Sequence, residues 1–276
     1  MVTRKDYVKK AVEAAKSVLI ELSHLLGEYQ ENIVIIGGWV PELVIPQEKQ
    51  KHTGSIDVDI AINHKKISEP GYKTILELLL SHGYRQGPQP FIFLRDVPVG
   101  DEIYEVEVDL MAGEYAGTGK SHRHQRIFDS HARKGRGIDL VFTDPEKILI
   151  SGRLPGGGKD SVTVQVSSIP VFIIMKCIAL DKRLKEKDAW DIYYCVRNYP
   201  GGIEILANKF SSITNHSLTK EAVIILSTKF SSPEDIGPRY VADFEEVNDS
   251  EQRLFIQRDA YERITYLIKR LQHVLK

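Results

Sequence analysis

The sequence predicts an α/β (α+β) protein in which a mixed β-sheet flanked by helices is followed by a C-terminal helical domain. Strand and helix patterns alternate along the first part of the chain. A turn-rich connection at residues 98–101 joins two strand patterns as an antiparallel hairpin would, which makes the expected sheet mixed. After Pro170 the apolar spacing is helical to the end. We therefore expect two domains, residues 1–167 and residues 168–276.

Each element of the first domain has its own pattern. Apolar residues at helical spacing predict a helix over residues 3–28, and the run of aliphatic residues at 33–36 predicts a buried strand. The elements expected next, in chain order, are a helix from Trp39, a strand over 55–62, a helix over 71–83 and strands over 91–95 and 104–111. Three shorter strands are expected over 138–142, 147–151 and 162–166. Pro155 and the three glycines after it favour a hairpin between the last two strands.

The second domain is expected to be a set of helices interrupted at residues 200–202 and around residues 231–238. The segment 250–276 carries apolar residues at helical spacing: Leu254, Tyr261, Ile264, Leu267, Ile268 and Leu271. It could pack internally or against a partner, and packing into the core is favoured. Cys177 and Cys195 lie on what the pattern predicts to be one long helix, about 27 Å apart, so they are expected to remain free thiols.

Composition narrows the function classes. The chain has 276 residues, of which 42% are hydrophobic and 27% charged, so it can bury a sizeable core. A formal net charge of −1 argues against nucleic-acid binding driven by overall charge, and leaves only a local basic patch for that purpose. No apolar run approaches the ~18 residues of a membrane span, and the N-terminus lacks a secretory pattern. We expect a cytoplasmic protein without a membrane partner.

The candidate chemistry begins with an acid pair. Alternation of apolar and polar residues over 55–62 places Asp57 and Asp59 on one face of a strand, where two carboxylates can share divalent ions. The strand at 104–111 repeats the alternation and offers Asp109 as a third carboxylate. Such a trio suits phosphoryl or nucleotidyl transfer with two metal ions. Glu105 and Glu107 on the same strand are better explained as solubilising residues.

A glycine turn precedes the acids. Gly37 and Gly38 end the strand at 33–36 immediately before a helix, where backbone N–H groups can meet a phosphate. Together with the acid pair, this turn indicates a nucleotide site.

These motifs resemble the nucleotidyltransferase superfamily, whose pattern is Gly-Gly or Gly-Ser on a strand–helix turn, Asp-x-Asp on the next strand and a later third Asp. The block from Lys176 to Ile192 is similar to the Lys-Leu-x-Ala-(three)-Arg-(three)-Arg-Asp-x-x-Asp-Leu motif of AbiEii-type nucleotidyltransferases, a family that includes toxins of abortive-infection and toxin–antitoxin systems. The resemblance spans roughly residues 30–200. The chain departs from the family at Trp39, where a hydroxyl residue is common, and at Lys187, which replaces an Arg.

The resemblance implies a nucleotidyltransferase-type sheet and a set of site residues. The residues expected to be catalytic are Asp57, Asp59, Asp109, Lys176 and Asp191. The residues expected to bind the NTP co-substrate are Gly37, Gly38, Ser55, Arg183 and Lys187. Asp57, Asp59 and Asp109 would hold two Mg²⁺ ions.

The helical block also has a reading of its own. Lys176, Arg183, Lys187 and Asp191 are spaced to lie along one face of a helix, as a polar stripe that can offset triphosphate charge. A solvated helix face with ordinary ion pairs is the alternative.

Residues 120–136 form a basic stretch between the third acid and the next strand. As a flexible loop beside a metal site it could hold the triphosphate or steer a polynucleotide acceptor, although a solvated loop explains it as well. His122 and His124 lack the further ligands of a zinc site.

The expected function is a metal-dependent transfer of a nucleoside monophosphate from an NTP to an acceptor hydroxyl of a tRNA end or a protein, as in a toxin that has a cognate antitoxin. Two alternatives stay open. One is a small-molecule nucleotidyltransferase of the antibiotic-modifying kind, which the basic stretch disfavours. The other is a non-catalytic module that binds nucleotide or a partner, which the intact acids disfavour.

Overall fold

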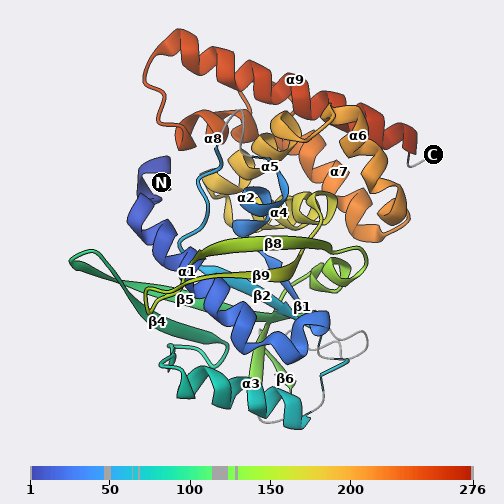
Figure 1. The fold of residues 1–276 in the computed structure, drawn as a ribbon. Helices are drawn as coiled ribbons and strands as arrows, with labels where there is room; N and C mark the ends of the chain where they lie inside the picture. Colours follow the sequence, from blue (N-terminus) through green and yellow to red (C-terminus); the bar gives the residue numbers. More distant parts are fainter. Residues whose placement is uncertain are drawn as a thin grey trace. The chain divides into compact units, whose positions relative to one another are not determined.

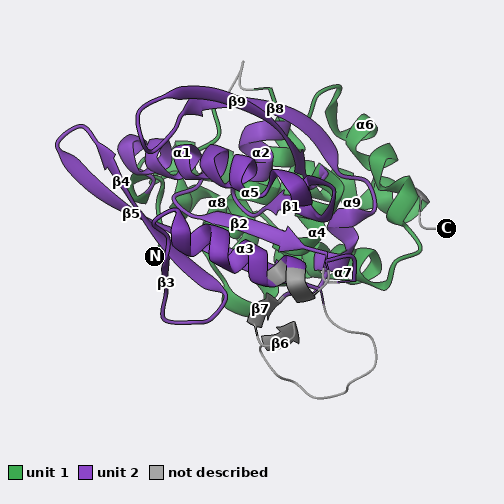
Figure 2. Cartoon of the chain, turned by 60° about the horizontal axis from the view of Figure 1, so that its bottom comes forward, with its two compact units in different colours: residues 1–6, 45–53, 169–276 green, residues 7–44, 54–168 purple. Residues whose placement is uncertain are grey.

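The computed structural model describes residues 2–46, 51–63, 65–67, 69–113, 124–127 and 130–274 (Figure 1). It shows a mixed β-sheet flanked by helices and a C-terminal helical region, as the sequence predicts. The chain divides into two units, coloured separately in Figure 2. The sheet unit comprises residues 7–44 and 54–168, and the helical unit comprises residues 1–6, 45–53 and 169–276.

Seven strands of the sheet lie in the order β3-β4-β5-β2-β1-β9-β8. Their bounds are Ile33–Ile36 (β1), Val58–Ile62 (β2), Arg85–Gln86 (β3), Ile92–Val99 (β4), Glu102–Ala112 (β5), Glu146–Arg153 (β8) and Lys159–Val166 (β9). Strand β2 pairs in parallel with β5, and β1 pairs in parallel with β9, whereas the other neighbours on this path are antiparallel. The predicted hairpins β4–β5 and β8–β9 are both confirmed.

Two parallel strands cannot be joined by a tight turn, so the chain makes a long connection between β2 and β5. It runs through helix α3 (Glu69–Ser81), the short strand β3 and the antiparallel strand β4 before it enters β5. The short helix α2 (Trp39–Val44) follows β1 directly. This order confirms the predicted strand, glycine turn and helix at residues 33–44.

Helix α1 (Lys9–Leu25) crosses the sheet and contacts strands β2, β4, β5, β8 and β9 (Figure 1). Its sheet-facing residues recur three and four apart, as the helical pattern predicts, and they are fully buried: Ala14, Ala15, Val18, Leu19 and Leu22. Hydrogen bonds to Glu21, which we call the Glu21 tie, also link α1 to Tyr84 and to strand β4. Glu21 accepts hydrogen bonds from the Tyr84 hydroxyl at 2.7 Å and from Arg95 at 3.0 and 3.1 Å.

The helical unit is built around helix α5. The helices are α4 (Ile169–Arg183), α5 (Glu186–Asn198), α6 (Gly202–Lys209), α7 (Ser217–Lys229), α8 (Ile236–Phe244) and α9 (Ser250–Val274). Helix α5 contacts α4, α6, α8 and α9, and every residue from Lys187 to Val196 is buried. The predicted interruptions at 200–202 and 231–238 coincide with the connections before α6 and α8.

The predicted final helix is present as α9. Its buried side chains include Ala260, Ile264, Leu267 and Leu271, so the helix packs into the core of its unit. Leu254, which the sequence pattern placed on the same face, is instead 59% exposed. Within the described ranges, none of the helices has both the length and the apolar character that crossing a bilayer would require.

The prediction of one long helix through residues 176–195 is wrong. Leu184 has φ +47°, a left-handed conformation that interrupts the helical hydrogen bonding between α4 and α5. Cys177 and Cys195 therefore lie on two different helices, and both are buried free thiols. Burial raises the pKa of each thiol, as expected for unreactive packing residues.

Two further expectations fail. Residues Ile138–Phe142 form a 3₁₀ helix (η3) instead of a strand, because Gly137 at φ +86° starts a turn that buries Ile138, Leu140 and Val141. The basic stretch is not simply a loop, since His124–Ile127 (β6) and Ser130–Lys134 (β7) pair as antiparallel strands and β7 also pairs with β5. Its residues 120–123 and 128–129 lie outside the described part of the chain.

The Glu21 tie leads to the first prediction. Glu21→Ala leaves the Tyr84 hydroxyl and the Arg95 guanidinium without their shared acceptor, so we expect it to lower the free energy of unfolding by about 2 kcal/mol. Glu13→Ala removes an exposed carboxylate from the same helix and is expected to stay within ~0.5 kcal/mol of wild type. Urea unfolding measures both changes, and equal effects would contradict a stabilising role for the tie.

Candidate functional site

Two of the three predicted acids lie side by side in the sheet unit. In the parallel pair β2–β5, Asp59 and Asp109 are direct register partners. Register partners of neighbouring strands project to the same face, and neighbouring strands are about 4.8 Å apart. The two carboxylates, 50 positions apart in the sequence, therefore come from adjacent points of one sheet face.

Asp109 differs from the other acids of its strand in burial. Glu105 and Glu107 share its face of β5 and are exposed, whereas Asp109 is 3% exposed. Burial of a carboxylate is costly unless hydrogen bonds, an opposite charge or a metal compensate it. The prediction that separated Asp109 from the two solubilising glutamates agrees with this difference.

The glycine turn touches the acid pair. Asp59 is also the register partner of Ile36 at the end of β1, and Gly37 is the next residue along that strand. Gly37 has φ +69°, and a Cβ atom built on it would lie 1.9 Å from Oδ2 of Asp59. The turn therefore needs glycine for two reasons: its backbone angle and the carboxylate packed against its Cα atom.

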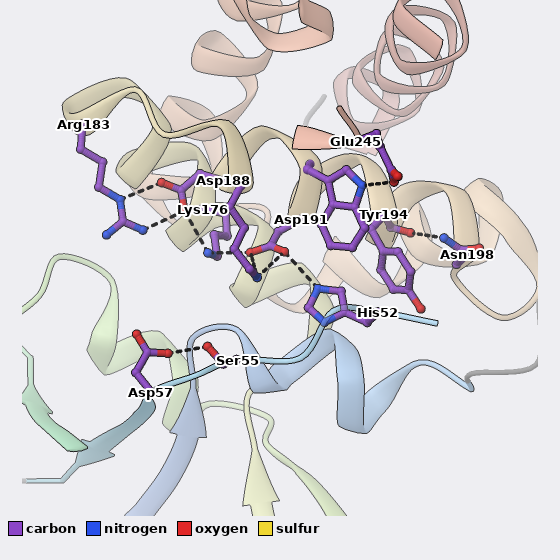
Figure 3. Close-up of polar contacts among 12 residues, drawn as sticks. His52, Ser55, Asp57, Lys176, Arg183, Asp188, Asp191, Tyr194, Asn198 and Glu245 are labelled. Atoms are coloured by element: carbon purple, nitrogen blue, oxygen red, sulfur yellow. Dashed lines mark hydrogen bonds and ion pairs between the residues drawn. The ribbon is translucent and has the colours of Figure 1, made fainter. Parts of the chain in front are cut away.

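Asp57 is held differently from Asp59. Strand β2 begins at Val58, so Asp57 lies just before the strand that the sequence predicts to contain it. The Ser55 hydroxyl donates a hydrogen bond to Oδ1 of Asp57 (Figure 3), and the indole N–H of Trp39 donates to its main-chain carbonyl oxygen at 2.7 Å. The predicted site residue Ser55 thus contacts a predicted metal ligand.

The donor atoms at this face suit magnesium. Carboxylate and hydroxyl oxygens are hard ligands, and Mg²⁺ is commonly held by one or two carboxylates together with substrate phosphates. Within the described ranges, no three His, Cys, Asp or Glu side chains gather closely enough to hold a metal ion. Asp59 and Asp109 supply two carboxylates, which is the number that such a Mg²⁺ site takes from the protein.

The predicted cations form a second polar cluster, which belongs to the helical unit. Arg183 makes a two-pronged contact with Asp188, from Nε at 2.7 Å and from the terminal nitrogen at 2.8 Å. Lys176 donates to Oδ1 of Asp188 at 2.9 Å and lies 2.7 Å from Oδ2 of Asp191. Figure 3 shows that Lys176 thereby joins the two aspartates.

Asp191 is the most heavily engaged residue of this cluster. Besides Lys176, it accepts from Lys187 one turn earlier, at 2.9 and 3.1 Å, and lies 3.0 Å from Nε2 of His52. Lys187 and Asp191 therefore form an i, i+4 ion pair. His52 comes from the segment 45–53 and packs against the rings of Trp190 and Tyr194, with centroid distances of 5.0 and 4.8 Å.

Burial makes these ion pairs strong. Asp188 and Asp191 are fully buried, and Lys176 and Lys187 nearly so. Burial alone would raise the pKa of Asp191, but the nearby Lys176 and Lys187 ammonium groups outweigh it and hold that pKa well below its usual range. Burial likewise opposes the charged form of Lys176, yet the two aspartates raise its pKa. The shifts of Lys176 and Asp191 both favour their charged forms, as expected for an ion-paired cluster.

The prediction of a polar stripe along one helix is wrong. Its residues lie on two helices, α4 and α5, because the chain turns at Leu184, and they face one another across that turn. The alternative of a solvated helix face is also wrong for Lys187 and Asp191, which are buried, and for Lys176, whose side chain is only 11% exposed.

Three contributors escaped the sequence reasoning. Asp188 stands inside the helical motif, and its spacing of five from Arg183 hid the pairing because the helix breaks between them. His52 meets Asp191 across 139 positions, for which no local signal exists. For Trp39, the sequence predicts only the start of a helix and the lack of a hydroxyl group beside the glycine turn.

Comparison of the chain with models of protein families, with curated protein sequences and with solved structures finds no match.

The contact between Gly37 and Asp59 leads to a prediction with a matched control. Gly37→Ala and Gly100→Ala both place a side chain at positive φ, +69° and +65°, but a Cβ on Gly100 meets nothing within 4 Å. We expect about 1 kcal/mol of destabilisation at Gly100 and an additional 1–3 kcal/mol, roughly, at Gly37. The additional cost should fall when Asp59 is replaced by Ala. Thermal unfolding of the four variants tests this, and an unchanged cost in the Asp59→Ala background would refute the contact.

The buried His52 leads to a prediction about pH. Burial lowers the pKa of His52 from 6.5 to about 4, against the opposing effect of Asp191 and with the help of Lys187 and Lys176. The unfolded chain therefore binds a proton that the folded chain does not between pH 6.5 and 4, and stability falls as the pH is lowered through that window.

At pH 5 this difference amounts to about 2 kcal/mol relative to pH 7.5. We expect His52→Gln to remove that part of the pH dependence, and His82→Gln, at an exposed histidine, to leave it in place. Urea unfolding at the two pH values decides, and parallel profiles for wild type and His52→Gln would rule out the assigned protonation.

Proposed function

We propose that this chain is a metal-dependent nucleotidyltransferase of the AbiEii type, which transfers a nucleoside monophosphate from an NTP to an acceptor hydroxyl. The observation that carries the proposal is the register pairing of Asp59 with Asp109 directly beside the Gly37 turn. It places two carboxylates and a close-approach glycine at one point of a sheet. That combination is suited to holding a triphosphate through divalent ions.

The proposed reaction is a single displacement. The acceptor oxygen forms a bond to the α-phosphorus of the NTP, the bond from that phosphorus to the bridging oxygen of the β-phosphate breaks, and pyrophosphate leaves. Asp59, Asp109 and Asp57 would hold the Mg²⁺ ions, which when bound neutralise phosphate charge and acidify the acceptor hydroxyl. Asp109 would complete the ligand set of the metal on the acceptor side and so favour loss of the acceptor hydroxyl proton, which passes to solvent.

The cations of the helical unit have a smaller part in this proposal than the sequence predicted. Lys176, Arg183 and Lys187 are already paired with Asp188 and Asp191. We propose that Asp191 keeps the two lysines in place, while the part of these cations in binding the NTP is what the resemblance implies. The acceptor, by resemblance, is a tRNA end or a protein hydroxyl, and an antitoxin is the corresponding partner.

The test is transfer of label from each α-³²P-labelled NTP, with Mg²⁺, to total tRNA or to protein. Asp59→Asn and Asp109→Asn keep the size of the side chain but remove its charge, and we expect each to lower the rate at least 100-fold. Glu105→Gln removes an exposed carboxylate from the same face of β5 and is expected to stay within twofold of wild type.

Each outcome is informative. Label on RNA or on protein identifies the acceptor class, and its loss in the two Asp variants alone supports the acid pair as the metal site. Transfer that survives in both Asp variants would remove the acids from the mechanism. Absence of transfer to either acceptor with every NTP, despite binding of Mn²⁺ to the acids, would favour a small-molecule acceptor or a binding module.

A further inference from the structure

Trp39 links the Gly37–Gly38 turn to the segment 54–57, which ends in Asp57 and which we call the acid segment. It directly follows the Gly37–Gly38 turn and is the first residue of α2. Its side chain is 1% exposed, so its indole N–H needs a hydrogen-bond acceptor inside the protein. That acceptor is the main-chain carbonyl of Asp57, at 2.7 Å.

The indole ring also lies near the other end of the acid segment, Gly54. Gly54 has φ +71°, and a Cβ atom built on it would lie 3.9 Å from two carbon atoms of the Trp39 ring. Trp39 therefore lies near Gly54 and hydrogen-bonds to Asp57, the two ends of the segment 54–57. These residues precede the first paired residue of β2, so the sheet ladder does not fix their conformation.

Two hydrogen bonds then define Asp57. The Trp39 indole fixes its carbonyl group, and the Ser55 hydroxyl fixes Oδ1 of its carboxylate. An acid that lies outside the regular strand would otherwise sample several backbone conformations, and ordering it on metal binding would cost conformational entropy. An aspartate whose conformation is already fixed before the metal binds avoids that cost.

We propose that Trp39 is a positioning residue for Asp57, a role that rests on the proposed function. It acts through the backbone of the acid segment and touches neither substrate nor metal. Its effect is on how readily Asp57 joins Asp59 in holding a divalent ion, and hence on metal affinity more than on the rate at saturating metal.

The first test compares two matched variants. Trp39→Phe keeps an aromatic ring and removes the indole N–H, while Trp190→Phe removes the hydrogen bond from the chain's other tryptophan to Glu245, at 2.6 Å, in the helical unit. Binding is measured with Mn²⁺ alone, from the loss of its free electron paramagnetic resonance signal. The Mg²⁺ concentration for half-maximal transfer and the rate at saturating Mg²⁺ are measured in parallel.

For Trp39→Phe we expect about fivefold weaker Mn²⁺ binding and a similar rise in the Mg²⁺ requirement, which is the value of one hydrogen bond, with the saturated rate within about twofold. Trp190→Phe should change none of these. Unchanged Mn²⁺ affinity in a folded Trp39→Phe protein would overturn the role of Trp39 and leave the proposed function intact.

A second measurement does not depend on that variant folding. Wild-type protein labelled with ¹⁵N gives two indole N–H signals, and Trp190→Phe identifies the one from Trp39. We expect Mg²⁺ to shift the Trp39 signal and Asp57→Asn to abolish that shift. A Trp39 signal that ignores saturating Mg²⁺ overturns the inference, whereas failure of wild type to bind Mn²⁺ or to transfer label overturns the proposed function and the role of Trp39 with it.

Discussion

The parallel pairing of β2 with β5 is the constraint on which the candidate site depends. It makes Asp59 and Asp109 register partners, and it forces the long connection through α3, β3 and β4 that separates them in sequence. Strand β1 on the other side of β2 then brings Gly37 against Asp59. A shift of one residue in either pairing would turn Asp59 to the opposite face from its partners.

The two units differ in where their aspartates lie and what surrounds them. In the helical unit, Asp188 and Asp191 are surrounded by Lys176, Arg183 and Lys187, so each aspartate is satisfied by cations of the same unit. Removal of one member from such a network costs more than the network contributes in total. In the sheet unit, Asp59 and Asp109 instead come from two neighbouring strands and bring two carboxylates to adjacent points of one sheet face.

The sequence predicts an element correctly where the spacing of apolar residues follows one period. It does not predict features that depend on contacts between residues far apart in the chain. The two-residue alternation of residues 104–111 found β5 and separated Asp109 from Glu105 and Glu107. The break at Leu184 was missed because leucine, lysine and glutamate all favour helix. The apolar run at 138–142 was assigned to a strand because five residues do not distinguish a strand from a buried turn of helix. The contacts of His52 and Trp39 depend on the completed fold.

The division of the chain has a consequence for taking the protein apart. Residues 1–6 and 45–53 belong to the helical unit although the sheet unit surrounds them in sequence. A polypeptide cut after residue 168 would keep His52 but lose Asp191, Trp190 and Tyr194, the three side chains that surround it. Its residues 45–53, immediately before Gly54 and the acid residues, would then lack these contacts of His52. The segment 45–53 thus depends for its contacts on helices of its own unit that are synthesised after it.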